Sequence, residues 1–187
     1  MPQKHLSKAL SLCLIPIISH AQIQHVTGTV TRVKDGDTFE LLYNLRKVPC
    51  RITHIDSPEK SQRYGINASD SLRQLIDRKL VNVTIHGTDL YGRKVVSITA
   101  INRVPLRVDS IMIARGWTWH GTQFCTCTEG AAWQEQARCN ALGIWVGFKK
   151  CPKDPPGTQT YPCPEPIQPW VYRTLNKFNK RIYDSCN

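Results

Sequence analysis

Two short motifs within residues 33–59 of this 187-residue chain bring together four carboxylates and one guanidinium. The segment contains VKDGDTF and, after a spacer of ten residues, CRITHIDSPE, and these motifs supply Asp35, Asp37, Arg51, Asp56 and Glu59. Carboxylate oxygens are the usual ligands of hard cations, and the planar fork of an arginine fits the oxygens of a phosphate. The pattern therefore indicates one site for a metal ion and a phosphodiester, although DGD alone is an ordinary turn signal.

The strand that carries Arg51 must be interrupted if this site is to form. In a continuous strand, Arg51 and Asp56 would point to opposite faces, because their separation is an odd number of residues. We therefore expect the strand to bend or end before Asp56. The Ser57-Pro58 pair gives a reason for it to stop, since proline and the residue before it fit poorly into a central strand.

Five short runs with strand character are expected to position these residues. They span residues 23–32, 37–43, 47–55, 80–87 and 93–101, and they are separated by turns such as those at 43–45 and 89–92. Short strands joined in this way predict a small barrel.

Helices are expected between and after these strands, which makes the predicted fold class α+β, mainly β. Apolar residues at helical spacing and glycine stop signals place them at 67–79, 107–115 and 130–142. A short basic helix could follow near the end of the chain, from Val171 to Tyr183.

The first 21 residues are typical of an export signal. Lys4 and Lys8 precede an apolar run at 9–18, and Ser19-His20-Ala21 offers a cleavage pattern. A buried N-terminal helix is the alternative interpretation. We expect cleavage after Ala21 and a secreted or periplasmic protein. The absence of an apolar run of ~18 residues argues against a membrane-spanning helix.

The chain is strongly basic, with a formal net charge of +11, of which the signal would remove two charges and leave +9. A positive excess suits a polyanionic partner through counterion release and electrostatic steering. It would also suit a cell wall or an anionic lipid surface, so charge alone does not select among these partners.

The cysteines predict a disulfide framework near the C-terminus. Of the eight cysteines, six lie within residues 125–186, a density typical of exported proteins. Many pairings of six cysteines are possible, and the sequence does not choose among them. Cys50, in a strand-like run, is the expected free thiol. A zinc site at Cys125 and Cys127 is the alternative, but its one-residue gap is tighter than zinc motifs use.

Composition divides the chain into three parts. We expect a signal peptide at 1–21, a folded domain at 22–147 and an irregular, disulfide-tethered extension at 148–187. Seven of the twelve prolines fall within residues 151–170 of that extension.

The motifs VKDGDTF, CRITHIDSPE, DLYGR and the late GIW resemble, in order and spacing, the staphylococcal nuclease (thermonuclease) family. The resemblance covers roughly residues 24–146. It implies a five-stranded barrel of the oligonucleotide-binding type with three helices. It also implies a calcium-dependent endonuclease that hydrolyses DNA and RNA with little sequence specificity, giving 3′-phosphate products. We expect such a protein to be a monomer.

The resemblance also assigns roles to individual residues. Asp37 and Asp56 match the carboxylate ligands of Ca²⁺, and Ser57 stands where a backbone carbonyl completes the metal's ligand shell. That carbonyl does not depend on the side chain, so serine in place of the family's threonine should be harmless.

The remaining matched residues would act on the substrate. Arg51 and Arg93 match two catalytic arginines, Glu59 matches a catalytic glutamate, and Tyr91 matches a tyrosine that contacts the nucleotide. Leu90 departs from the family pattern, which has a lysine there, and the loop after Glu59 is shorter.

Aromatic residues after the second predicted helix have two possible roles. Trp117, Trp119, His120 and Phe124 could stack on nucleotide bases. Packing in the core is the alternative for Trp117, and a surface position is the alternative for His120.

Two other functions remain open from the sequence alone. The same barrel often binds nucleic acid without cutting it, so a non-catalytic binding protein is the main alternative. A wall-binding or adhesion protein would depend on the cysteine-rich extension alone. The combination of two arginines and three acids favours the enzyme, because binding alone would not require that set.

Overall fold

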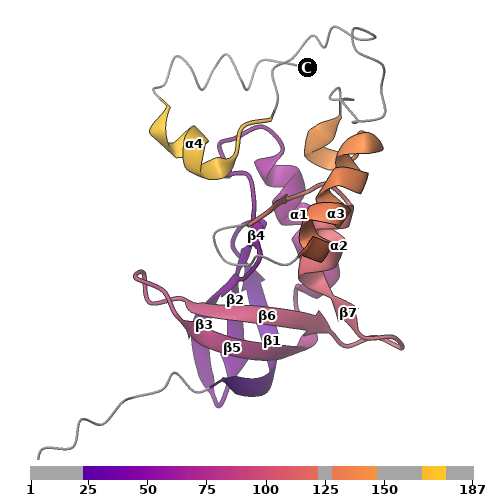
Figure 1. Ribbon diagram of the computed structural model, residues 1–187. Coiled ribbons are helices and arrows are strands. Elements are labelled where there is room, and N and C mark those ends of the chain that lie inside the picture. Colours follow the sequence, from indigo (N-terminus) through magenta and orange to yellow (C-terminus); the bar gives the residue numbers. More distant parts are fainter. Residues whose placement is uncertain (1–22, 122–127, 147–165, 176–187) are drawn as a thin grey trace, which may run out of the picture.

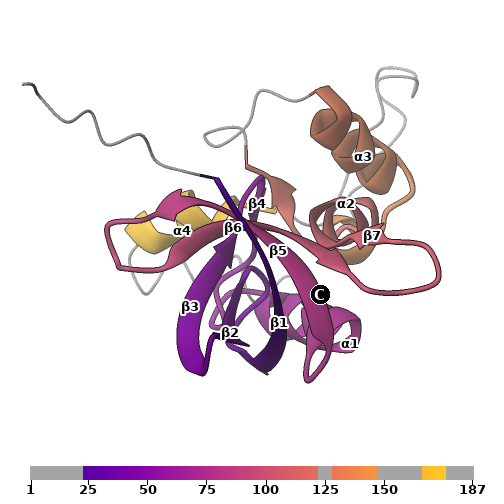
Figure 2. The same cartoon turned by 90° about the horizontal axis from the view of Figure 1, so that it is seen from below.

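A closed barrel of five strands forms the centre of the protein. The computed structural model describes residues 23–121, 128–146 and 166–175. The barrel strands are β1 (Gln24–Val33), β2 (Thr38–Tyr43), β3 (Arg46–Ile52), β5 (Leu80–Thr88) and β6 (Lys94–Ala100). Neighbours in the order β3-β2-β1-β5-β6 are antiparallel, and parallel pairing of β3 with β6 closes the barrel. Figure 2 shows these strands surrounding a common interior.

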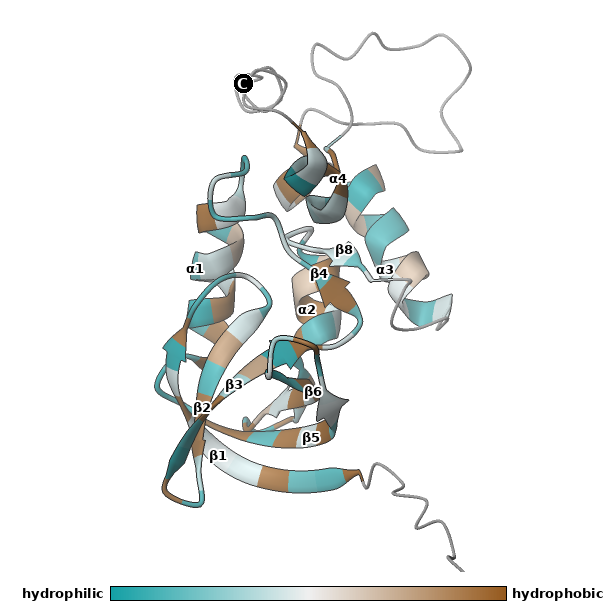
Figure 3. Ribbon diagram, turned by 90° about the vertical axis from the view of Figure 1, so that its left-hand side faces the viewer, coloured by the Kyte–Doolittle hydropathy of each residue, from teal (hydrophilic) through white to brown (hydrophobic). Residues whose placement is uncertain are grey.

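Alternating side chains fill the barrel interior. In β5, Val81, Val83 and Ile85 are buried, and the residues between them are more exposed. This alternation follows from the two-residue period of a strand, and hydropathy alternates along the barrel strands in Figure 3. Leu72 and Ile76 of α1 (Gly65–Ile76) belong to the same core.

A helical layer lies at one end of the barrel (Figure 1). It contains α1, α2 (Val108–Ala114), α3 (Thr128–Cys139) and the short 3-10 helix η1 (Gly143–Trp145). Gly143 has a φ of 56°, and a Cβ there would lie 2.2 Å from the carbonyl oxygen of Gly116, so this contact requires glycine.

Three short elements complete the fold. β4 (Ile55–Asp56) pairs with β8 (Trp119–His120), and β7 (Leu106–Arg107) extends the edge of β6. The helix α4 (Pro169–Thr174) lies at the end of the molecule away from the barrel (Figure 1).

The predicted barrel and the order of its strands are confirmed, whereas the helix ends are shifted. α1 begins at Gly65 and ends at Ile76, two and three residues earlier than predicted, and α3 ends at Cys139 instead of residue 142. The predicted basic helix at 171–183 begins earlier, as α4, and its residues from 176 lie outside the described part of the chain.

Several predictions concern residues outside the described part of the chain. The signal peptide and most of the cysteine-rich extension belong to this group, so the three-part division and the disulfide framework stay predictions. Cys50 is a buried free thiol as predicted, and burial raises its pKa to about 12. Within the described residues, no helix has the length and apolarity needed to cross a membrane.

Candidate active site

A cleft of about 930 Å³ brings most of the predicted site residues together. Its walls come from the start of β2, from β3, from the segment after β4 and from the hairpin between β5 and β6. Six of the seven predicted residues line it: Asp37, Arg51, Ser57, Glu59, Tyr91 and Arg93. The seventh, Asp56, is fully buried and is joined to the cleft by Arg51.

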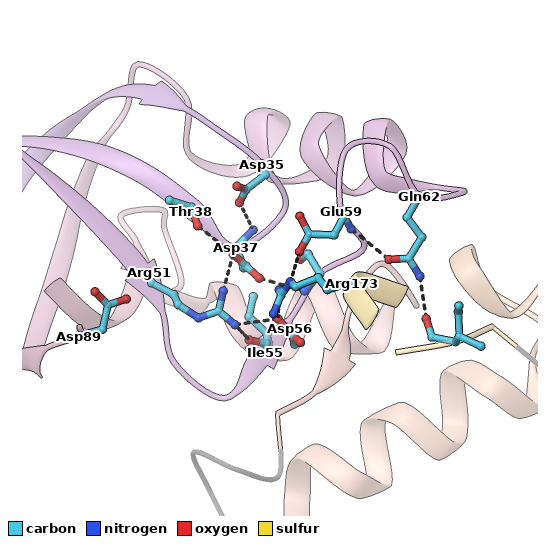
Figure 4. A network of polar contacts seen from close by, with 12 residues as sticks. Asp35, Asp37, Thr38, Arg51, Ile55, Asp56, Glu59, Gln62, Asp89 and Arg173 are labelled. Carbon is cyan, nitrogen blue, oxygen red and sulfur yellow. Dashed lines mark hydrogen bonds and ion pairs between the residues drawn. The ribbon is translucent and has the colours of Figure 1, made fainter. Parts of the chain in front are cut away.

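Arg51 bridges the two aspartates (Figure 4). Its Nη1 lies 3.0 Å from Oδ1 of Asp37, and its Nη2 donates a hydrogen bond of 2.7 Å to Oδ1 of Asp56. The exposed fractions of these side chains are 11% for Arg51, 6% for Asp37 and 1% for Asp56. Charges this buried interact strongly, and the two carboxylates hold the guanidinium in a fixed orientation.

The expected interruption of the strand before Asp56 is confirmed. β3 ends at Ile52, and a turn at Thr53 and His54 separates it from β4. His54 has a φ of 66°, in the left-handed region, which changes the chain direction and breaks the alternation of side chains. This turn precedes Ser57-Pro58, which the sequence had suggested as the cause.

Close packing of the loop before β2 orients Asp37. Its Oδ1 accepts a hydrogen bond of 2.9 Å from the Thr38 hydroxyl, and its Oδ2 accepts one of 3.0 Å from the Ser57 backbone N–H. Gly36 makes this approach possible, because a Cβ at that position would lie 2.6 Å from the Ser57 hydroxyl oxygen. The turn signal Asp35-Gly36-Asp37 therefore also serves to place a carboxylate.

The cluster holds more negative charge than Arg51 alone offsets. Burial, and then the charge of Asp37, raise the pKa of Asp56 above its usual value. The same two causes raise the pKa of Asp35 to about 6. Although burial opposes it, the charges of Asp37 and Asp56 raise the pKa of Arg51. Ionisation of Asp35 and Asp56 would therefore be favoured by a further cation.

The donor atoms fit a hard divalent cation. Among the described residues, none donates a hydrogen bond to the buried Oδ2 of Asp56, which is costly unless another group satisfies it. These donors are few: within the described residues, no cluster of three or more His, Cys, Asp or Glu side chains could hold a metal ion by itself. The predicted set has two carboxylates and one carbonyl, so water or substrate oxygens would complete the ligand shell of a calcium ion.

A tight turn between β5 and β6 positions Arg93 and Tyr91. Asp89 accepts hydrogen bonds of 2.9 Å from the backbone N–H groups of both residues, and its Oδ2 lies 2.7 Å from Nε of Arg93. Nη1 of Arg93 lies 3.4 Å from the Thr38 hydroxyl, beside Asp37. Tyr91 is 84% exposed, with Arg93 over its ring, so it is open to contact with a ligand.

Arg173 also lines this cleft and contacts two of the predicted site residues, but sequence reasoning did not include it. Its Nε donates a hydrogen bond of 2.5 Å to Oε1 of Glu59, and its Nη2 lies 3.7 Å from Oδ1 of Asp56. Arg173 belongs to α4, 114 positions after Glu59. A basic composition near the C-terminus was the only sequence signal, and it does not indicate a contact with this site.

Trp117 and Trp119, the two tryptophans after α2, are core residues rather than part of the cleft. Trp119 is 2% exposed and packs edge-on against Trp145, with ring centroids 6.1 Å apart. Trp117 packs against the main core, and His120 is buried rather than at the surface. Base stacking by Trp119 is therefore excluded by its burial, and Phe124 lies outside the described residues.

Comparisons with known proteins identify the family of this chain. Residues 49–147 match the family described as staphylococcal nuclease homologue. An uncharacterized endonuclease of Escherichia coli O157:H7 is 30% identical over 148 residues, which cover 79% of this chain and 85% of that protein. A micrococcal nuclease of Shigella flexneri is 27% identical over 178 residues, covering 91% and 93%. A staphylococcal-like nuclease of Arabidopsis thaliana is 32% identical over 101 residues, covering 54% and 30%.

These matches show that the chain belongs to the staphylococcal nuclease family. The protein is therefore a nuclease, an enzyme that hydrolyses phosphodiesters. The individual roles predicted for the site residues are a separate question, which the comparisons do not address.

Proposed function

We propose that the protein is a calcium-dependent endonuclease that hydrolyses DNA and RNA with little sequence specificity and leaves 3′-phosphate ends. The observation that carries this proposal is the bridge from Arg51 to Asp37 and Asp56, at the wall of a cleft that also contains Glu59 and Arg93. The printed names of the relatives, which include endonuclease and micrococcal nuclease, support it.

Asp37, Asp56 and the Ser57 carbonyl would hold the calcium ion. When bound, calcium would act as a Lewis acid that polarises a phosphoryl oxygen and orients a water molecule. The unsatisfied Oδ2 of Asp56 and the Asp37 carboxylate fixed by Ser57 support these assignments.

Glu59 and the two arginines would act directly on the substrate. Glu59, on the wall of the cleft, would accept a proton from the attacking water. Arg51 and Arg93 would donate hydrogen bonds to phosphate oxygens, whose negative charge increases in the transition state. Exposed Tyr91 would contact the nucleotide.

We also propose that the protein is exported after removal of residues 1–21 and acts as a monomer. The order of charged, apolar and small residues in that segment supports export. The net charge of +9 expected after cleavage would attract nucleic acid.

Digestion with and without calcium tests the proposed function. Plasmid DNA and single-stranded RNA incubated with the purified protein should both be degraded when calcium is added, and degradation should stop with a chelator. The DNA fragments should prime a polymerase only after phosphatase treatment, because a 3′-phosphate blocks extension. Electrophoresis of the products measures both results. A band shift without degradation would indicate the non-catalytic binding protein instead, and equal degradation with a chelator would exclude calcium dependence.

A further inference from the structure

The segment that contains α4 is packed against the loop that carries Glu59. Tyr172 is 2% exposed, and its hydroxyl donates a hydrogen bond of 3.0 Å to the Ser61 carbonyl. Gln62 joins the two segments, because its Nε2 donates to the Ile167 carbonyl at 2.7 Å while its Oε1 accepts from the Glu59 N–H at 3.1 Å. Arg173 therefore reaches the cleft from an anchored position.

Two guanidinium groups approach the same carboxylate in this cleft. Oδ1 of Asp56 lies 2.7 Å from Nη2 of Arg51 and 3.7 Å from Nη2 of Arg173. The two positive charges repel each other, and the carboxylates of Glu59 and Asp56 offset this repulsion.

The contacts of Arg173 are those that a phosphate would make. A guanidinium binds carboxylate and phosphate oxygens through the same fork of N–H donors, so Glu59 occupies a position suited to an anionic ligand. The Arg173 side chain is 52% exposed, in contrast to 11% for Arg51, so it can leave Glu59 without breaking a buried contact.

We propose that Arg173 is a third phosphate-binding arginine of this nuclease, contributed by the segment that follows the family domain. The proposal rests on the proposed function, in which a nucleic acid chain enters this cleft. When substrate binds, Arg173 exchanges the Glu59 carboxylate for a phosphate oxygen of the nucleic acid. The exchange leaves Glu59 available to accept a proton from water. Arg173 thus acts in substrate binding, and residues 166–175 form part of the active site.

A salt titration of binding tests this role. A fluorescent single-stranded oligothymidylate is titrated with the wild type, R173A, R173K and R103A in a chelator, so that no cleavage occurs, and anisotropy is read at several salt concentrations. Arg103 is an exposed arginine in the loop between β6 and β7, outside the cleft lining, and R103A removes the same charge at a distance. The catalytic parameters kcat and KM are then measured in calcium.

We expect R173A to weaken binding about tenfold and to raise KM by a similar factor, because one charge-assisted contact is lost. The slope of log affinity against log salt should become smaller by about 0.7, the contribution of one phosphate contact to a single strand. R173K should lie between R173A and the wild type, and R103A should keep the wild-type slope.

Three results would overturn the proposal. An unchanged affinity and salt slope in R173A would show that Arg173 is only a structural contact of Glu59. Increased activity in R173A would show that α4 obstructs the site. Failure of the wild type to bind the oligonucleotide would also contradict it. If the wild type binds but does not cut in calcium, the proposed function fails while the binding assay still tests Arg173.

Discussion

Replacing Arg51 with alanine is expected to reduce kcat/KM by about 10²–10³ and to destabilise the fold by about 3–5 kcal/mol. Both effects follow from one side chain, because Arg51 is a proposed donor to the phosphate and the buried partner of Asp37 and Asp56. Its loss leaves the two buried carboxylates without the cation that bridges them. Steady-state kinetics and urea unfolding measure the two effects separately.

The loss of stability in R51A should depend on pH. Burial already raises the folded-state pKa of Asp56, and loss of the Arg51 guanidinium, which opposes that rise, should raise it further above the unfolded value. The folded state then binds more protons than the unfolded state, so stability falls as pH rises through the acidic range. We therefore expect R51A to be more destabilised near pH 8 than near pH 5, measured without calcium.

Two further variants separate the roles of Arg51. R51K keeps a positive charge but lacks a planar fork to hold both aspartates, so it should recover part of the stability and little of the activity. R93A removes the other proposed arginine, which pairs with Asp89 in the turn between β5 and β6 and is 24% exposed, against 11% for Arg51. It should lose comparable activity at a cost of about 0–1 kcal/mol in stability. Near-normal activity in R51A would contradict the proposed role.

The substitution E59Q is expected to lower kcat by about 10²–10⁴, the usual contribution of a general base. Glutamine keeps the shape of the side chain and an oxygen that can accept from Arg173, but it cannot take a proton from water at neutral pH. Affinity for nucleic acid should change little. Single-turnover cleavage measures the chemical step, and anisotropy in a chelator measures binding.

E40Q is the matched control for E59Q. Glu40 also lines the cleft, but it pairs with Lys47 and Thr31 and has no proposed catalytic role. This variant removes the same negative charge and should cut at nearly the wild-type rate. An unchanged rate in E59Q would remove Glu59 from the mechanism, and equal losses in both variants would point to the charge of the cleft instead.

The barrel could be predicted because its signals are local. The alternation of Val81, Val83 and Ile85 needs only the two-residue period of a strand, and the turn residues at 89–92 mark the next boundary. The interruption between Arg51 and Asp56 could also be predicted, since the odd separation requires it once both residues face one site.

Other features depend on tertiary contacts that the sequence does not display. Gly143 was interpreted as a helix stop, but it meets the Gly116 backbone, and the helix ends four residues earlier at Cys139. The left-handed conformation of His54 has no glycine or asparagine to announce it. The contact from Arg173 to Glu59 joins positions 114 residues apart, which no local pattern encodes.

Calcium binding by wild-type protein and D56N tests the central claim most directly, namely that Asp37 and Asp56 form one metal site. Calorimetric titration of chelator-treated protein should give one calcium ion per wild-type chain and an affinity at least about tenfold weaker for D56N. Circular dichroism would establish that D56N is folded. Equal calcium affinity in the two folded proteins would contradict the claim.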